Sequence, residues 1–544
     1  MRSNHVPVLI IGGGLTGLTS ALFLARHKVD YLLIERHATT AIHPKAGGIT
    51  FRTMELFREL GLEKNIRAAG KSLENCRGRI AVHTMAEADP EEVKRARIAQ
   101  AENDESMSEI IRKISPSKVT ACYQIDLEPM LLQEAQKLGG KLWFNHELVS
   151  YKQDDIGVTA IVRDRETKEE QMIHSDYLIA ADGAKSSIRK HADIPTTGRG
   201  NIGGHYINIY FQADLSDLIQ GDAFGFSMIL HPEVLGALIP VNNNDRWIYH
   251  VAYNPLKGET PEDFSAERCQ KIVRKAIGMP NLNVKILSTS PWEATESTAV
   301  RFQDNRVFLA GDAAHLMPPT GGFGSNTGVQ DAHNLAWKLA AVIHDQANPK
   351  LLETYQEERQ PVVQLTTDYA SSILLRAANK EEDNLNNMDS LAVTVGYKYC
   401  SAAIIDQDAT SYRMDVLELG GRPGTRAPHM WGTYEGKRIS ILDLLGRNFV
   451  LFTGAEHNSW STAAQTIASH LGTSINVYRI CPKGDFVDQD NIFGRLYGIN
   501  PEGAVLVRPD GFIGWRTEKG VLTPDLVLEE VMNCLLCNSS LNEK

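Results

Sequence analysis

The chain has 544 residues, of which 42% are hydrophobic and 23% charged, and its formal net charge is −11 with a pI near 5.9. This balance is typical of a globular protein with several domains, and the negative charge argues against a nucleic acid or an anionic membrane as partner. No apolar run approaches the length of a membrane span, and seven irregularly spaced cysteines favour reduced thiols, so we expect a cytoplasmic protein with no membrane partner.

The first elements predict a dinucleotide site. An apolar strand over Val8–Ile11 runs into a Gly-x-Gly-x-x-Gly turn, which opens a helix with one apolar face. Such a turn lets the backbone approach a pyrophosphate at the positive end of the helix. The residues that we assign to this turn are Gly12, Gly14, Leu15, Thr16 and Gly17.

The next strand, Tyr31–Ile34, ends at Glu35. A carboxylate at this position accepts hydrogen bonds from ribose hydroxyls and repels a 2′-phosphate, so the site suits FAD or NAD rather than NADP. A glycine-rich turn that binds nothing is the alternative, and the strand, helix and acid together make it the weaker one.

Two later strands are predicted to end at the same edge. Tyr177–Ala181 is followed by Asp182-Gly183, and Arg306–Ala310 is followed by Gly311-Asp312. Ligands of open α/β sheets lie beyond such strand ends. We therefore expect these ends to meet one extended cofactor, with Asp312 accepting hydrogen bonds from a ribityl chain.

The loop after Asp312 is rich in proline and glycine. Pro318 fixes the backbone, while Gly322 and Gly324 allow a flat ring to lie against it. Asn326 is predicted as the N-cap of the following helix, whose positive end would face the flavin ring.

Alternating strands occupy the segment from residue 191 to 291, which we predict to be a substrate-binding sheet. His231, Tyr249 and His250 are its candidate substrate contacts, although a histidine or tyrosine on a strand is more often packed in the core. No catalytic base and no metal site are assigned.

A third domain is predicted over residues 425–544, after a Gly/Pro-rich linker at Leu419–His429. Cys534 and Cys537 are predicted to lie in its final helix, and two cysteines alone do not make a zinc site. The first strand-to-helix junction, "GAEHNSW", has no Cys-x-x-Cys pair. We expect this domain to be structural or an oligomer contact, for example in a homodimer.

The stretches "IIGGGLTGL", "PKAGGITFRTMELFRELGL", "YQIDLEPMLLQEA", "YLIAADGAKSSIR" and "VFLAGDAAHLMPPTGGFGSNTGVQDAHNLAWKLA" resemble the class A flavoprotein aromatic hydroxylases, the para-hydroxybenzoate hydroxylase group. "RWIYHVAYNP" and "YGINPEGAVLVRPDGFIGWR" look like the branch that hydroxylates polycyclic polyketides. The resemblance implies an α/β fold with three parts. These are a Rossmann-type FAD-binding domain over 1–190 and 292–400, interrupted by a variable charged segment at 86–116, the β-sheet substrate domain, and a thioredoxin-like C-terminal domain.

The resemblance also implies the chemistry. NAD(P)H would reduce a tightly bound FAD, O2 would form a C4a-hydroperoxide, and a hydroxyl group would pass to an aromatic, phenolic or polycyclic substrate. By position, Arg36 and Gln124 would join the FAD contacts, and Lys45 stands where relatives have an arginine, with Arg52 as the alternative for that role.

Other functions stay open at this point. A monooxygenase that inactivates an antibiotic would use the same residues on a different substrate. A flavin halogenase is disfavoured because the sequence has no Trp-x-Trp-x-Ile-Pro stretch. A non-catalytic FAD-binding protein is the non-enzyme alternative.

Overall fold

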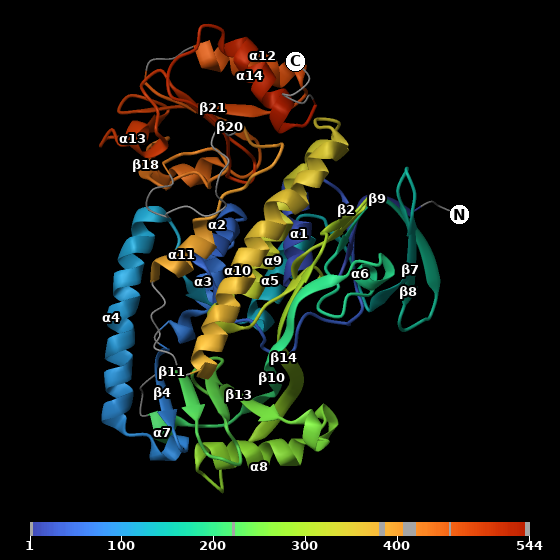
Figure 1. Cartoon of the computed structure of the whole chain (residues 1–544), viewed down its shortest axis with the longest axis vertical. Helices are drawn as coiled ribbons and strands as arrows, with labels where there is room; N and C mark the ends of the chain where they lie inside the picture. The colour runs from blue at the N-terminus through green and yellow to red at the C-terminus, as the bar shows by residue number, and fades with distance from the viewer. Residues whose placement is uncertain are drawn as a thin grey trace.

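Three large β-sheets organise the chain, and buried apolar clusters pack against them, the largest of which extends from the first sheet into the third (Figure 1). The computed structural model describes residues 4–74, 76–219, 224–379, 387–405, 420–455 and 459–538. Helices and strands alternate in the first and third sheets, so the predicted α/β class is confirmed.

The first sheet is the expected dinucleotide-binding sheet. Its strands follow the spatial order β15-β16-β9-β1-β2-β6 and are parallel from β16 to β6. These strands are β15 (Gln303–Asp304), β16 (Val307–Leu309), β9 (Glu170–Ala180), β1 (Asn4–Ile11), β2 (Tyr31–Glu35) and β6 (Lys141–Phe144), with the hairpin β7 (His146–Gln153) and β8 (Val158–Asp164) attached to β9. Segments far apart in sequence therefore share one sheet.

Helices pack around this sheet. α1 packs against both α5 and α9, and α9 packs against the long helix α10. Their bounds are α1 (Leu15–Arg26), α2 (Phe51–Glu59), α3 (Glu63–Ala69), α5 (Gln124–Lys137), α6 (Ser187–His191), α9 (Phe323–Ile343), α10 (Thr354–Asn379) and α11 (Asn387–Val395), with a small sheet of β3 (Gly48–Ile49) and β5 (Thr120–Ala121) beside them.

The second sheet lies at the opposite end of the molecule from the third (Figure 1). Its order is β17-β14-β10-β13-β12-β11-β4, and the strands are β17 (His315–Leu316), β14 (Lys285–Ala299), β10 (Thr196–Gln212), β13 (Arg246–Tyr253), β12 (Gly236–Pro240), β11 (Phe224–Ile229) and β4 (Arg77–Val82). Ile207, Ile209 and Phe211 of β10 pack into the cluster that contains α8 (Ala266–Ile277). Since side chains alternate along a strand, Tyr206 and Asn208 lie on the other face.

The charged segment at 86–116 forms a single long helix, α4 (Pro90–Ile114), preceded by Asp89, whose side chain accepts a hydrogen bond from the backbone of Glu91. Figure 1 shows α4 running along one side of the molecule from the second sheet toward the third. Its Ile111 is buried with Phe51 of α2, which fixes the upper end of the helix.

The third sheet forms the C-terminal unit, the name used below for the described residues from 420 to 538. β20 and β21 are parallel and joined through α12, and the antiparallel hairpin β23–β24 and α14 follow, as expected of a thioredoxin-like fold. The elements are β18 (Trp431–Tyr434), β19 (Lys437–Ser440), β20 (Phe449–Thr453), α12 (Ser459–His470), β21 (Ile475–Cys481), β22 (Phe486–Val487), α13 (Phe493–Tyr497), β23 (Ala504–Val507), β24 (Ile513–Thr517) and α14 (Pro524–Leu535).

The C-terminal cysteines are not paired. Cys534 lies in α14, Cys537 follows that helix, and no disulfide joins the cysteines of the described residues. Part of the junction at 454–460 and residue Leu419 of the predicted linker lie outside the described residues. Among the helices of the described residues, none is long and apolar enough to cross a membrane.

Candidate functional site

The predicted site residues gather at one edge of the first sheet. β1, β2, β9 and β16 are parallel and end at Ile11, Glu35, Ala180 and Leu309. Their carboxyl ends therefore meet at the same edge, where ligands of open α/β sheets bind.

Gly12 and Gly17 allow close packing at this edge, whereas Gly14 leaves space in front of it. Gly12 has φ +111°, and a Cβ there would lie 2.2 Å from the carbonyl oxygen of Ala181, while a Cβ on Gly17 would lie 1.8 Å from the carbonyl oxygen of Gly12. Any side chain at these two positions would displace the turn. At Gly14 the nearest atom to such a Cβ is Glu128 Oε1 at 3.6 Å, so this glycine leaves the outer side of the turn open.

Glu35 is held against the glycine turn. Its Oε2 accepts a hydrogen bond from the backbone N–H of Gly13 at 2.6 Å, and its Oε1 accepts one from the N–H of His37 at 2.7 Å. Arg36 is exposed, and its carbonyl oxygen accepts a hydrogen bond from Arg165. The strand end thus presents one fixed carboxylate and one free cationic side chain.

Leu15, Gln124 and Asn326 line one narrow recess in front of the turn. Gln124 donates a hydrogen bond to Glu128 one turn further along α5, and the second oxygen of Glu128 accepts one from the N–H of Ala41 at 2.8 Å. Burial raises the pKa of the Glu128 carboxyl. Sequence reasoning missed Glu128, although its spacing of four from Gln124 on a helix was a usable signal.

Gly311 and Asp312 follow β16 and face the first turn of α1. A Cβ on Gly311 would lie 2.3 Å from Thr16 Oγ1, so the two segments are in direct contact. The Asp312 side chain is exposed to solvent, yet the surrounding protein raises the pKa of its carboxyl by desolvation. We infer from this combination that the carboxylate faces a cleft.

The loop before α9 differs from prediction at one residue. α9 begins at Phe323 after Gly322, which has φ +67°, so Asn326 lies inside the helix and is not its N-cap. Instead Asn326 Oδ1 accepts a hydrogen bond from Thr50 N at 3.0 Å, and its Nδ2 donates one to the Gly48 carbonyl at 3.0 Å. It ties the segment at 48–50 to α9.

Gly322 lies just before α9, and Gly324 lies in its first turn. Pro318 is buried, a Cβ on Gly322 would come no closer than 4.0 Å to any atom, and one on Gly324 would lie 3.6 Å from Met317. The loop therefore offers a surface without bulky side chains at Gly322.

Lys45 and Arg52 occupy different surroundings. Lys45 is exposed, and its charge lowers the pKa of both Asp312 and His43 as a secondary effect after burial, which places it near the cleft. Arg52 is buried and pairs with Glu55 at 2.9 Å, and it donates to the carbonyl of Asp510 in the C-terminal unit. Arg52 is thus not available as the alternative to Lys45.

Asp182 accepts hydrogen bonds at the start of the short helix α6, whose N-cap is Ser186. Its Oδ2 accepts hydrogen bonds from the N–H groups of Ser187 at 2.8 Å and Ile188 at 3.3 Å, while its Oδ1 is buried without a hydrogen-bond partner. A buried acceptor of this kind needs a donor. Together with the glycine turn and Asp312, it fits an elongated ligand rich in hydroxyl groups, as FAD is.

The three substrate candidates of the second sheet have separate locations. Tyr249 is fully buried on the α8 face, and its hydroxyl donates a hydrogen bond to the Val234 carbonyl, so it offers nothing to a ligand on the other face. His231 lies in the turn after β11, with its ring centroid 4.8 Å from that of His83. His250 lies on the open face opposite Asn208.

The open face of the second sheet is aromatic and polar. Trp292 stacks on Tyr206 with ring centroids 4.5 Å apart, donates a hydrogen bond to Asn208 Oδ1 at 2.9 Å, and meets His250 edge-on at 5.6 Å. Burial lowers the pKa of His250 to about 4, although its side chain keeps some solvent exposure. Like Asp312, His250 therefore faces an internal cleft.

His43 connects this face to the first sheet, and sequence reasoning missed it. Its Nδ1 lies 2.7 Å from Ser288 Oγ, its ring meets Tyr210, and its Nε2 is buried without a partner. Burial lowers its pKa to about 4, so the imidazole is neutral. Its position two residues before Lys45 carries no motif of its own, so no local signal identifies it.

Comparisons with known proteins cover the whole architecture. The FAD-binding domain family matches residues 5–370, and the aromatic-ring hydroxylase C-terminal family matches residues 420–536. A tetracenomycin A2 monooxygenase-dioxygenase of Streptomyces glaucescens is 39% identical, over 95% of this chain and 94% of that protein. A 4-methyl-5-nitrocatechol 5-monooxygenase of a Burkholderia species is 36% identical, over 98% of each.

A solved structure extends this similarity to three dimensions. The aklavinone-11 hydroxylase in complex with FAD and aklavinone is 33% identical and superposes with a TM-score of 0.88, covering 99% of this chain and 100% of that one. The expected resemblance is thereby confirmed, together with FAD as cofactor. The chain belongs to the FAD-dependent aromatic-ring hydroxylases and is a flavin monooxygenase.

Proposed function

We propose that this enzyme hydroxylates a polycyclic aromatic polyketide, with NAD(P)H and O2 as co-substrates. The observation that carries the proposal is the open face of the second sheet, where Tyr206, Trp292 and His250 form an aromatic wall. Flat fused rings bury large areas against such walls. Relatives named for their action on tetracenomycin A2 and on aklavinone support a substrate of this class.

FAD would lie along the edge of the first sheet. Glu35 would accept hydrogen bonds from the ribose hydroxyls, and Asp182 and Asp312 would accept them from the part of FAD that joins its two ring systems. Gly322 would lie under the flavin. The full set proposed to contact FAD is Gly12, Gly14, Leu15, Thr16, Gly17, Glu35, Arg36, Lys45, Gln124, Asp182, Gly311, Asp312, Pro318, Gly322, Gly324 and Asn326.

When bound, FAD supplies the redox chemistry and the activation of oxygen. The protein then has to orient the substrate and keep water out. His43 and His250 are neutral at physiological pH because burial lowers both pKa values to about 4. A base this weak does not deprotonate a phenol well, but it accepts a hydrogen bond from one, so we assign both histidines to orientation.

A monocyclic nitrocatechol is the second candidate substrate, since one relative of nearly equal identity is named for that activity. The open face distinguishes the two because a single ring would contact only part of the Tyr206–Trp292 stack. We expect the polycyclic substrate to have the lower KM.

The test uses purified enzyme with bound flavin. NADH and NADPH oxidation is measured with aklavinone, 4-methyl-5-nitrocatechol and 4-hydroxybenzoate, and products are analysed by mass spectrometry after reaction with isotopically labelled O2. Incorporation of one labelled oxygen atom into the polycyclic compound supports the proposal. Turnover of only the monocyclic compounds contradicts it.

A further inference from the structure

A dry cluster of charges joins the C-terminal unit to the helices behind the FAD-binding sheet. Arg508, after β23, makes two bonds to Glu358 of α10, from Nη1 to Oε1 at 2.6 Å and from Nη2 to Oε2 at 2.9 Å. Lys338 of α9 donates to the same carboxylate at 2.8 Å. The side chains of all three are 0% exposed.

These charges depend on one another. Burial opposes ionisation of Glu358, but Arg508 and Lys338 outweigh it and hold its pKa well below the usual range. Burial also lowers the pKa of Lys338 to about 8 despite the pull of Glu358. Removing one partner from such a cluster leaves a buried charge with too little compensation.

A second buried cluster holds the turn that carries Asp312. Asp331 of α9 accepts hydrogen bonds from the N–H of Gly311 at 3.1 Å, from His315 Nε2 at 2.7 Å and from Arg359 Nε at 2.8 Å. Asp331 is 0% exposed. Burial disfavours its ionised form, yet Arg359 and His315 together lower its pKa to about 2.

The two clusters are connected through α10 and Tyr399. Glu358 and Arg359 are consecutive residues, and each belongs to one cluster. Arg359 Nη1 also donates to the Tyr399 hydroxyl at 3.1 Å, and the Tyr399 ring stacks on Phe512 of the C-terminal unit with centroids 4.0 Å apart. A continuous path of buried contacts therefore runs from the C-terminal unit to Gly311.

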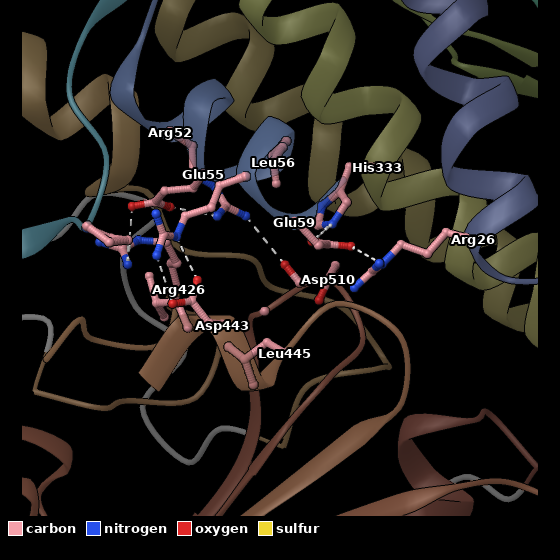
Figure 2. A pocket seen from close by; sticks show the side chains of 14 residues that line it. Arg26, Arg52, Glu55, Leu56, Glu59, His333, Arg426, Asp443, Leu445 and Asp510 are labelled. Atoms are coloured by element: carbon pink, nitrogen blue, oxygen red, sulfur yellow. Dashed lines mark hydrogen bonds and ion pairs between the residues drawn. The ribbon is translucent and has the colours of Figure 1, made fainter. Parts of the chain in front are cut away.

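The neighbouring part of the same interface holds a cavity. Figure 2 shows this cavity, which side chains of α1, α2 and α9 line on one side. Asp443 and Asp510 of the C-terminal unit line it on the other side. Its volume is about 170 Å³ and its charges are paired with one another, as Arg26 is with Glu59 at 2.9 Å. This cavity is separate from the recess at Gln124, and Asp510, which lines the cavity, also pairs with Arg508.

We propose that the C-terminal unit positions the Gly311–Leu316 turn of the FAD site, with Arg508 and Asp331 as positioning residues at the two ends of this path. The C-terminal unit is then a working part of the cofactor site although it contributes no contact to FAD. The proposal rests on the proposed contact between Asp312 and FAD.

The test compares two arginines of the C-terminal unit. Arg508→Met removes the charge that reaches α10, whereas Arg516→Met removes one whose partners, the carbonyls of Gly420 and Tyr497, lie within the unit. Hydrogen exchange of the apo-protein is followed in the peptide covering residues 307–318, and the Kd for FAD is measured by flavin fluorescence.

We expect Arg508→Met to speed exchange in this peptide and to raise the Kd by about tenfold, with Arg516→Met changing neither. Combined with Asp331→Asn, Arg508→Met should add little further, because both variants interrupt one path. Arg508→Lys keeps the charge and is the variant to use if Arg508→Met does not fold. In the same two measurements it should give a smaller effect in the same direction.

The proposal is overturned if, in either Arg508 variant, hydrogen exchange rises only within the C-terminal unit and the Kd for FAD equals that of wild type. The exchange measurement needs no FAD. If Asp312 proves not to contact FAD, the assignment of the cofactor site fails while the effect of Arg508 on the turn is still measured.

Discussion

His43 Nδ1 lies 2.7 Å from Ser288 Oγ, and this hydrogen bond joins the segment after β2 to strand β14 of the second sheet. His43 belongs to the connection that follows β2 of the first sheet and Ser288 to the second sheet, and the flavin and the substrate are proposed to meet between these two parts. The bond therefore fixes the separation of the two walls of the cleft at one point. It also fixes the direction of His43 Nε2, the buried nitrogen without a partner.

Replacing Ser288 with alanine should release His43 without touching FAD. We expect unchanged FAD content and a KM for the aromatic substrate raised by about tenfold, the cost of one lost buried hydrogen bond. Steady-state kinetics and flavin absorbance test this. Thr289→Ala is the control, since Thr289 is exposed and lies on the other face of β14. Equal KM values for the two variants would speak against the role of His43.

Asp312→Ala should weaken FAD binding. A carboxylate that faces the cleft and accepts ribityl hydrogen bonds is worth about 1.5–3 kcal/mol, or about tenfold to a hundredfold in Kd. Asp193→Ala, in the exposed turn after α6, controls for the loss of a negative charge. Retention of full FAD occupancy and turnover by Asp312→Ala would remove Asp312 from the site.

His43 should make stability depend on pH. Its pKa is about 4 in the folded protein and 6.5 as the ordinary value. Between these values the unfolded chain binds more protons, so stability falls as the pH is lowered through this window, by up to about 3 kcal/mol. The loss of Tm from pH 6.5 to about 4 should be smaller in His43→Gln than in wild type. If Tm falls equally with pH in both proteins, protonation of His43 does not cause the loss of stability.

Gly322→Val tests the smooth surface in front of α9. The added side chain would stand in open space beside the proposed flavin ring, and its left-handed backbone would be strained. Gly436→Val is a matched control, because Gly436 has φ +75°, has nothing within 4 Å of a Cβ, and lies in the β18–β19 turn. We expect slower anaerobic flavin reduction by NADPH, followed by stopped-flow absorbance with substrate present, in Gly322→Val only. Identical rates in both variants would exclude contact with the ring.

The sequence predicts the parts of this molecule that are locally encoded. Strand ends followed by Gly12, Asp182 or Asp312 were identified because each turn is specified by residues next to it in the chain. The prediction of Asn326 as an N-cap was wrong because α9 starts earlier, at a glycine with positive φ.

Long-range pairs could not be predicted in the same way. Alternation along β13 puts Tyr249 and His250 on opposite faces, but only the packing of α8 decides that Tyr249 is the one buried in the core. The partners Arg508 and Glu358 lie 150 positions apart in sequence, and charged residues at such separations carry no pattern. Only the tertiary structure shows which of Tyr249 and His250 is buried and that Arg508 meets Glu358.

The order of strands in the first sheet has a consequence for biosynthesis. β16 pairs with β9 along Leu178–Ala180. Every strand of the second sheet except β17 precedes β16 in the chain, so β16 is translated only after them. Until then this part of β9 has an open edge, and the Gly311 turn does not exist. We therefore expect ribosome-bound chains that stop before Val307 to be unable to retain FAD, so that cofactor loading follows translation of the second sheet.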